Sequence, residues 1–101
     1  MSNNPVAKVD DIADGGVIRC PFGDIEVAIF RKGDEFHAIN ASCPHRRGPL
    51  DEANLEDGYI AVCPWHGWRF DIRTGKSPTH PGQVECFRVT VRDGALYLEH
   101  T

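Results

Sequence analysis

The sequence predicts an all-β fold, built as a sandwich or small barrel. Apolar and polar residues alternate with a period of two in several short segments, as they do in strands with one buried face. Turn signals separate these segments at short intervals. The pair Asp93-Gly94 is a combination that two-residue hairpin loops favour. With 101 residues, of which 41% are apolar, the chain can form one domain (1–101) around a small core.

The N-terminal half contains three predicted strands. Residues 17–22 form the first. In 25–30, Ile25, Val27 and Ile29 alternate with other residues, which predicts a strand buried on one face only. A turn over 31–34 then leads into a third strand over 35–40.

The C-terminal half continues the same pattern. Segment 51–56 is the only one with helical character, and we expect one turn there at most. Strands are expected over 59–62 and 68–72, followed by a turn at 74–75 and a proline-containing loop over 76–83. The alternating segment 87–92, the turn at 93–94 and the return over 95–99 predict a final hairpin.

Composition limits the classes of partner. The formal charge of −4 argues against a nucleic-acid partner. No apolar run reaches the length of a membrane span, and the N-terminus lacks the apolar stretch of a signal peptide. We therefore expect a cytoplasmic protein without a membrane anchor. In that compartment Cys20 and Cys86, both in strand-like segments, are expected to be buried free thiols and not a disulfide.

Four residues form the candidate metal site: Cys43, His45, Cys63 and His66. They occur as Cys-Pro-His, then seventeen residues (46–62), then Cys-Pro-Trp-His. Each half offers one thiolate and one imidazole from a tight loop. Zinc also accepts two cysteines and two histidines, but small zinc fingers place both cysteines before both histidines. A zinc site stays the alternative, and chance is disfavoured because the Cys-Pro start and a following glycine occur twice.

The segments ASCPHRRGPL (41–50) and CPWHGWRF (63–70) resemble the Rieske family closely. The resemblance implies a [2Fe–2S] cluster, one per chain, in which Cys43 and Cys63 bind one iron and His45 and His66 bind the other. It also implies a Rieske fold, in which a small cluster-binding subdomain is inserted into a larger β base. Its boundaries would fall near residues 42 and 71.

The same resemblance places the chain toward the low-potential end of the family. High-potential members carry a disulfide between the two loops, and its positions here are Gly48 and Trp65. They also carry a serine and a tyrosine whose hydroxyls bond to sulfur, and the matching residues here are Trp68 and Phe70. Hydrogen bonds to sulfur favour the more negative reduced state, so their loss lowers the potential.

The implied function is that of a Rieske-type ferredoxin, a carrier and not an enzyme. Such proteins pass single electrons from a flavin-dependent ferredoxin reductase to a terminal oxygenase that hydroxylates aromatic rings. The chain lacks a second domain for a mononuclear iron and a nucleotide-binding fingerprint, so it is expected to be neither oxygenase nor reductase. A small subunit of an assimilatory nitrite reductase and a cluster-based redox sensor stay open as alternatives.

Partners are expected to dock where the histidine-bound iron lies nearest the surface. This tip would consist of His45, Arg46, Arg47, His66 and Gly67. Around it we expect a ring of acids that includes Asp51, Glu52 and Glu56. The negative net charge should steer the tip toward basic partner faces. The alternative is that these acids only keep the domain in solution.

Overall fold

The computed structural model of the chain describes residues 5–42, 50–56, 58–64, 67–78 and 83–100. Within these ranges the regular structure is β-strand apart from two single 3-10 turns, so the all-β prediction is confirmed. None of the helical segments described has the length or apolarity needed to cross a membrane. In chain order the elements are β1 (Ala7–Lys8), η1 (Val9–Asp11), β2 (Val17–Phe22), β3 (Ile25–Lys32), β4 (Glu35–Asn40), η2 (Leu50–Glu52), β5 (Asn54–Glu56), β6 (Ile60–Val62), β7 (Arg69–Asp71), β8 (Cys86–Arg92) and β9 (Ala95–His100).

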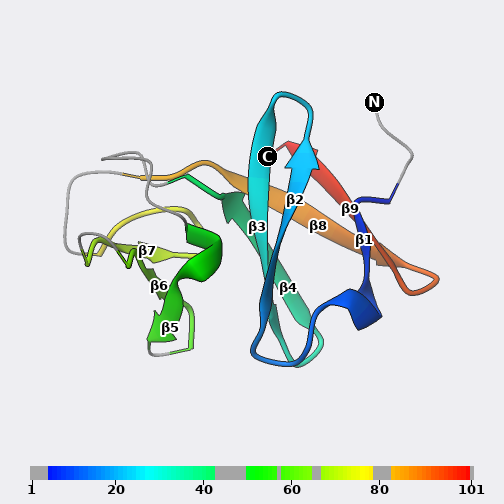
Figure 1. The fold of residues 1–101 in the computed structure, drawn as a ribbon, viewed down its shortest axis with the longest axis horizontal. Coiled ribbons are helices and arrows are strands. Elements are labelled where there is room, and N and C mark those ends of the chain that lie inside the picture. The colour runs from blue at the N-terminus through cyan, green and yellow to red at the C-terminus, as the bar shows by residue number, and fades with distance from the viewer. Residues whose placement is uncertain (1–4, 43–49, 57, 65–66, 79–82, 101) are drawn as a thin grey trace.

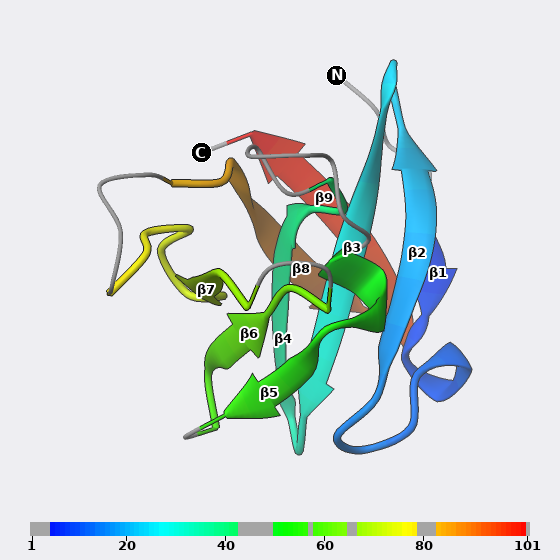
Figure 2. The same cartoon turned by 60° about the vertical axis from the view of Figure 1, so that its left-hand side comes forward.

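The strands form two antiparallel sheets. The larger sheet has the order β1-β9-β8-β4-β3-β2, and the smaller sheet has the order β5-β6-β7. The smaller sheet is inserted in the sequence between β4 and β8. It lies to one side of the strongly twisted larger sheet (Figure 1) and, seen from the second direction, in front of β4 (Figure 2).

The hairpins form where the turn residues predict them. Asp93 and Gly94, between β8 and β9, have φ values of 51° and 76°. Positive φ at both central residues is the conformation of a type I′ turn, which matches the twist of the flanking strands. The predicted single helical turn in segment 51–56 is η2, which begins at Leu50. The rest of the segment, Asn54–Glu56, is strand β5 and was not predicted.

Strand β3 is buried on both faces, and the prediction of one buried face was wrong. Val27, Ala28, Ile29 and Phe30 are each at most 1% exposed. Ala28 and Phe30 belong to a cluster between the two sheets, whereas Val27 and Ile29 belong to a cluster on the other face of the larger sheet. The alternation in the sequence therefore separates two cores, and does not separate core from solvent.

We call the cluster between the sheets the inter-sheet core, because both sheets contribute to it. Its buried members are Ala28, Phe30, Ile39, Ala41, Leu50, Ala53, Ala61, Cys63, Phe70, Ile72 and Val84.

A polar junction around Tyr59 joins the smaller sheet to the β3–β4 hairpin. The Tyr59 hydroxyl donates to Glu35 Oε2 at 2.9 Å. Two cations lie over its ring, with Lys32 Nζ at 4.4 Å and Arg73 Cζ at 4.2 Å from the ring centre. His37 meets the ring edge-on and also hydrogen-bonds Glu35 at 3.2 Å. The junction thus ties the two sheets together through groups that carry charge.

The charge of Glu35 makes this junction sensitive to acid. Hydrogen bonds from His37 and then from Tyr59 hold the pKa of Glu35 below its ordinary value. A lowered pKa in the folded state adds stability above the unfolded-state pKa of about 4.3, and this is lost as pH falls through the folded-state value. We expect Glu35→Gln to be less stable than the parent at pH 7, with a difference that shrinks below about pH 4. Urea unfolding at several pH values measures this.

The control for this experiment is Asp34→Asn, which removes an exposed acid from the adjoining turn. It should leave the stability and its pH dependence close to those of the parent. An equal stability difference between Glu35→Gln and the parent at pH 3 and pH 7 would show that the carboxylate charge does not strengthen the junction.

Candidate metal centre

The two candidate ligand loops begin and end at hydrogen-bonded stems. The Leu50 N–H donates to the Ala41 carbonyl at 2.8 Å, which closes the loop over residues 42–49. In the second loop the Cys63 N–H donates to the Trp68 carbonyl at 2.8 Å, and the Gly67 N–H donates to the Cys63 carbonyl at 2.9 Å. Each predicted ligand pair therefore belongs to a short loop whose ends are fixed.

The inter-sheet core brings these two stems together. Ala41 and Leu50 from the first stem and Cys63 from the second are buried members of this cluster, each at most 1% exposed. The packing of the two sheets therefore positions both loops. Sequence spacing alone would leave the relative position of the loops undetermined.

Cys63 is the predicted ligand whose position the structure describes. Its thiol is free and 1% exposed. Cys43, His45 and His66 lie outside the described residues, and no group of three metal-binding side chains forms among the residues that are described. A buried free thiol at the stem of a tight loop fits a soft metal ion such as the iron of an iron–sulfur cluster.

Gly67 has a backbone role in the second loop. Its φ of +69° is a conformation that residues with a side chain rarely adopt. An added Cβ would meet no atom within 4 Å, so the requirement for glycine comes from the backbone angle and not from crowding. Its amide already bonds to the Cys63 carbonyl.

The two aromatic residues after the second loop pack into the inter-sheet core. Phe70 is fully buried, and Trp68 is half-buried against the same cluster, with 6.3 Å between their ring centres. No buried polar side chain occurs in the part of the chain that the structure describes. The buried residues that cluster with Cys63 are therefore apolar. Trp65 and Gly48 lie outside the described residues.

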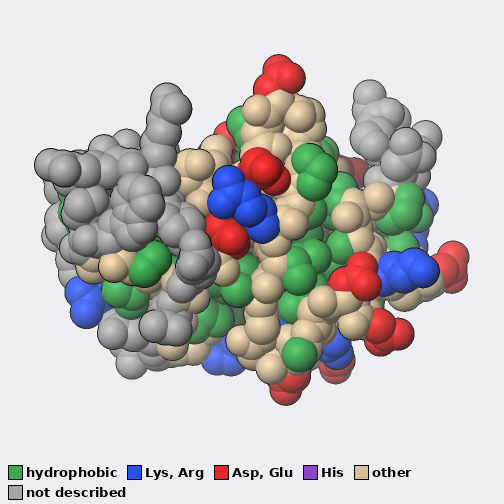
Figure 3. All heavy atoms as spheres, in the orientation of Figure 1, with side chains coloured by type: hydrophobic (Ala, Val, Ile, Leu, Met, Phe, Trp, Pro, Cys, Tyr) green, Lys and Arg blue, Asp and Glu red, His purple; other side chains and the backbone are tan. Residues whose placement is uncertain are grey.

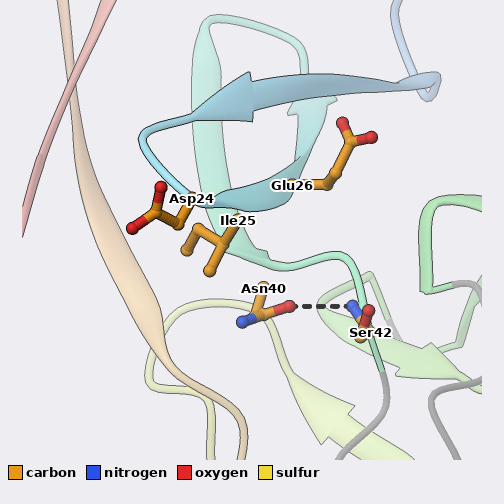
Figure 4. A pocket seen from close by; sticks show the side chains of 5 residues that line it. All are labelled: Asp24, Ile25, Glu26, Asn40 and Ser42. Carbon is orange, nitrogen blue, oxygen red and sulfur yellow. Dashed lines mark hydrogen bonds between the residues drawn. The ribbon is translucent and has the colours of Figure 1, made fainter.

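A polar hollow lies where β4 leads into the first loop. The Asn40 side-chain oxygen accepts the Ser42 N–H at 2.9 Å and turns the chain out of the strand (Figure 4). The hollow, of about 440 Å³, is lined by Asp24, Ile25, Glu26, Asn40 and Ser42. Sequence reasoning missed it, although Asn-x-Ser at the end of a strand is a recognisable turn signal.

Asp51, predicted to be a docking acid, has a partner within the chain. Its Oδ1 accepts a hydrogen bond from Arg19 Nη1 at 2.9 Å, and Arg19 Nε lies 3.6 Å from Glu26 Oε1. The side chains of Glu52 and Glu56 lie outside the description. Asp51 is therefore not available as an unpaired acid of the predicted ring.

The other two cysteines lie away from the loops. Cys20 is a buried free thiol, as predicted, in the core on the opposite face of the larger sheet. Its pKa is raised, mainly by burial and to a smaller extent by the nearby negative charge of Glu26. Cys86 forms no disulfide within the described residues, and it is half-buried against the inter-sheet core. It lies at the start of β8, opposite Ile39 of β4, and the prediction that it is fully buried was wrong.

Together the fold and the loop stems define a small all-β metal-binding protein. Comparison with known families identifies which one: the chain belongs to the Rieske [2Fe-2S] domain family, whose model matches residues 2–91. It therefore carries a Rieske-type [2Fe–2S] cluster.

Known proteins resemble the chain along nearly its whole length. It is 32% identical to the 3-phenylpropionate/cinnamic acid dioxygenase ferredoxin subunit of Photorhabdus laumondii, over 97% of this chain and 94% of the relative. The solved ferredoxin of carbazole 1,9a-dioxygenase from Nocardioides aromaticivorans superimposes with a TM-score of 0.88 at 28% identity, over 97% of both chains. A chain in the solved complex of reduced oxygenase and oxidized ferredoxin of carbazole 1,9a-dioxygenase matches at TM-score 0.83 and 32% identity, over 94% and 90% of the chains.

The nitrite-reductase alternative has weaker support. A solved protein described as an NADPH nitrite reductase small subunit superimposes with a TM-score of 0.80, over 98% of this chain and 99% of that one, but at 18% identity. A match at this level of sequence identity is evidence for the fold alone.

Proposed function

We propose that this protein is a Rieske-type ferredoxin that takes single electrons from a flavin-dependent reductase and delivers them to a terminal aromatic-ring-hydroxylating oxygenase. On this proposal it is a carrier and not itself an enzyme. The observation that carries the proposal is the similarity to ferredoxin components along nearly the whole of both chains. That the protein works in the cytoplasm stays a prediction.

The proposed ligands are Cys43 and Cys63 for one iron, and His45 and His66 for the other. When bound, the cluster accepts and releases one electron at a time. The chain's own residues hold the loops and exclude water: the inter-sheet core buries the Cys63 thiol, and Leu50 and Phe70 fill the space around the loop stems. Burial of this ligand limits the rearrangement of water that accompanies a change of charge.

We also propose that residues 42–71 act as the cluster-binding subdomain. The separate three-stranded sheet, inserted between β4 and β8, supports this. Partners would dock at its tip, at His45, Arg46, Arg47, His66 and Gly67. On the face shown in Figure 3, basic and acidic side chains of the described residues are interspersed and form no patch of one sign. The proposal of electrostatic steering therefore rests on the overall charge of −4.

Reconstitution tests this function. The holoprotein is mixed with NADH and with reductase and oxygenase candidates encoded beside its gene, and oxygen uptake and hydroxylated product are followed. We expect aromatic hydroxylation only when all three proteins are present. Electron delivery to a sirohaem nitrite reductase, with no oxygenase activity, would instead support the nitrite-reductase alternative. If none of the reductase candidates reduces the holoprotein, the carrier role is contradicted.

A further inference from the structure

Arg19 connects the edge of the larger sheet to the end of the first ligand loop. It lies on β2, and its guanidinium bonds to Asp51, which belongs to η2 and lies 32 residues further along the chain. The Asp51 side chain is 19% exposed, whereas that of Arg19 is 41% exposed. Because the carboxylate is partly shielded from water, screening weakens this pair less than an ordinary surface salt bridge.

Both carboxylates that Arg19 reaches adjoin the main-chain bonds that fix the loop. The Ala41 N–H donates to the Glu26 carbonyl at 2.9 Å, and the Ala41 carbonyl accepts from Leu50, the residue before Asp51. The single turn η2, green in the ribbon, packs beside β2 and β3 (Figure 1 and Figure 2). Arg19 therefore joins β2 to Asp51, next to the Leu50 end of the segment 42–49, and also reaches Glu26, whose carbonyl holds the Ala41 end.

We propose that Arg19 is a positioning residue for the metal centre. Its ion pair with Asp51 holds the end of the first ligand loop on the larger sheet and so keeps Cys43 and His45 in binding position. This inference rests on the proposed ligand assignment. Without the pair, the end of the loop is fixed mainly by the Leu50–Ala41 bond and by apolar packing, so local opening becomes more frequent and iron is released faster.

The test compares rates of cluster loss. Holoprotein at pH 7 is mixed with excess EDTA, and bleaching of the visible absorption is followed. We expect Arg19→Met, which keeps the aliphatic stem, and Asp51→Asn to lose the cluster about fivefold faster than the parent, which corresponds to about 1 kcal/mol. The exchanged pair Arg19→Asp/Asp51→Arg, combined with Glu26→Gln so that the new carboxylate at position 19 does not face a like charge, should return to within about twofold of the parent rate.

Two control variants separate positioning from general stability. Arg88→Met removes an exposed arginine from β8, another strand of the same sheet. Tyr59→Phe removes the hydrogen bond to Glu35 at the junction between the smaller sheet and the β3–β4 hairpin. Both should bleach within about twofold of the parent rate, even though Tyr59→Phe lowers the melting temperature.

Each other outcome overturns the inference. Parent-like bleaching of Arg19→Met would show that the ion pair does not hold the loop. If Tyr59→Phe bleaches as fast as Arg19→Met, the faster cluster loss comes from lower fold stability. If the exchanged pair does not restore the parent rate, the faster cluster loss comes from lost packing. A parent protein that contains zinc and no iron or sulfide would instead refute the ligand assignment, and the inference with it.

Discussion

Replacing Cys63 by serine should abolish assembly of the normal cluster, whereas Cys20→Ala and Cys86→Ala should keep the full visible spectrum. Serine offers a hard hydroxyl in place of a soft thiolate, at a position that is 1% exposed to solvent. Cys20 belongs to the core on the far face of the larger sheet, and Cys86 packs at the edge of the inter-sheet core. Visible absorption and iron content after identical reconstitution measure the difference.

The matching variants of the other proposed ligands extend this prediction. Cys43→Ser should fail in the same way as Cys63→Ser. His45→Cys or His66→Cys would add one negative charge beside the cluster, so any variant that assembles should have a strongly lowered potential. Because the cluster links two loops, the serine variants should also unfold at lower temperature. Loss of the cluster in Cys20→Ala or Cys86→Ala would show that the ligand assignment is wrong.

The midpoint potential should lie toward the low end of the Rieske range, on the order of −150 mV. Trp68 and Phe70 offer no hydroxyl to sulfur, and the buried residues that cluster with Cys63 are apolar. If each missing hydrogen bond would strengthen by ~1–2 kcal/mol on reduction, its absence lowers the potential by roughly 45–90 mV for one electron. A spectroscopic redox titration at pH 7 measures this value.

The pH dependence of the potential offers a second measurement on the same sample. An imidazole that binds iron through one nitrogen can lose the proton on the other. Oxidised iron lowers that pKa more than reduced iron does, so the potential should be flat around neutrality and fall only at alkaline pH. A midpoint above roughly +100 mV at pH 7 would show that other donors replace the missing hydroxyls.

Much of the fold could be predicted because its signals are local. Residues 17–22 and 35–40 are strands with the predicted bounds, and Asp93-Gly94 marks the turn of the last hairpin between two alternating segments. β1 and β5, strands of two and three residues, were missed because they are too short to show a period. β6 and β7 are as short but were recognised because they adjoin the second ligand motif. Burial of both faces of β3 depends on the smaller sheet, which comes later in the chain, so the pattern within β3 could not reveal it.

The candidate site divides in the same way between local and long-range features. Cys63 and Gly67 are recognisable because the ligand loop is a contiguous motif with fixed spacing. The Arg19–Asp51 pair and the junction of Tyr59 with Glu35 join residues 32 and 24 positions apart. Among many surface charges, the sequence contains no signal for which acid meets which base. The folded sheets decide those partners.

Iron and acid-labile sulfide analysis, with the EPR spectrum of the reduced protein, tests the central claim most directly. The account predicts two irons and two labile sulfides per chain. It also predicts an average g value below that of plant-type ferredoxins, because two histidines replace two cysteines on one iron. Zinc bound one to one with the chain, with no labile sulfide, would contradict it.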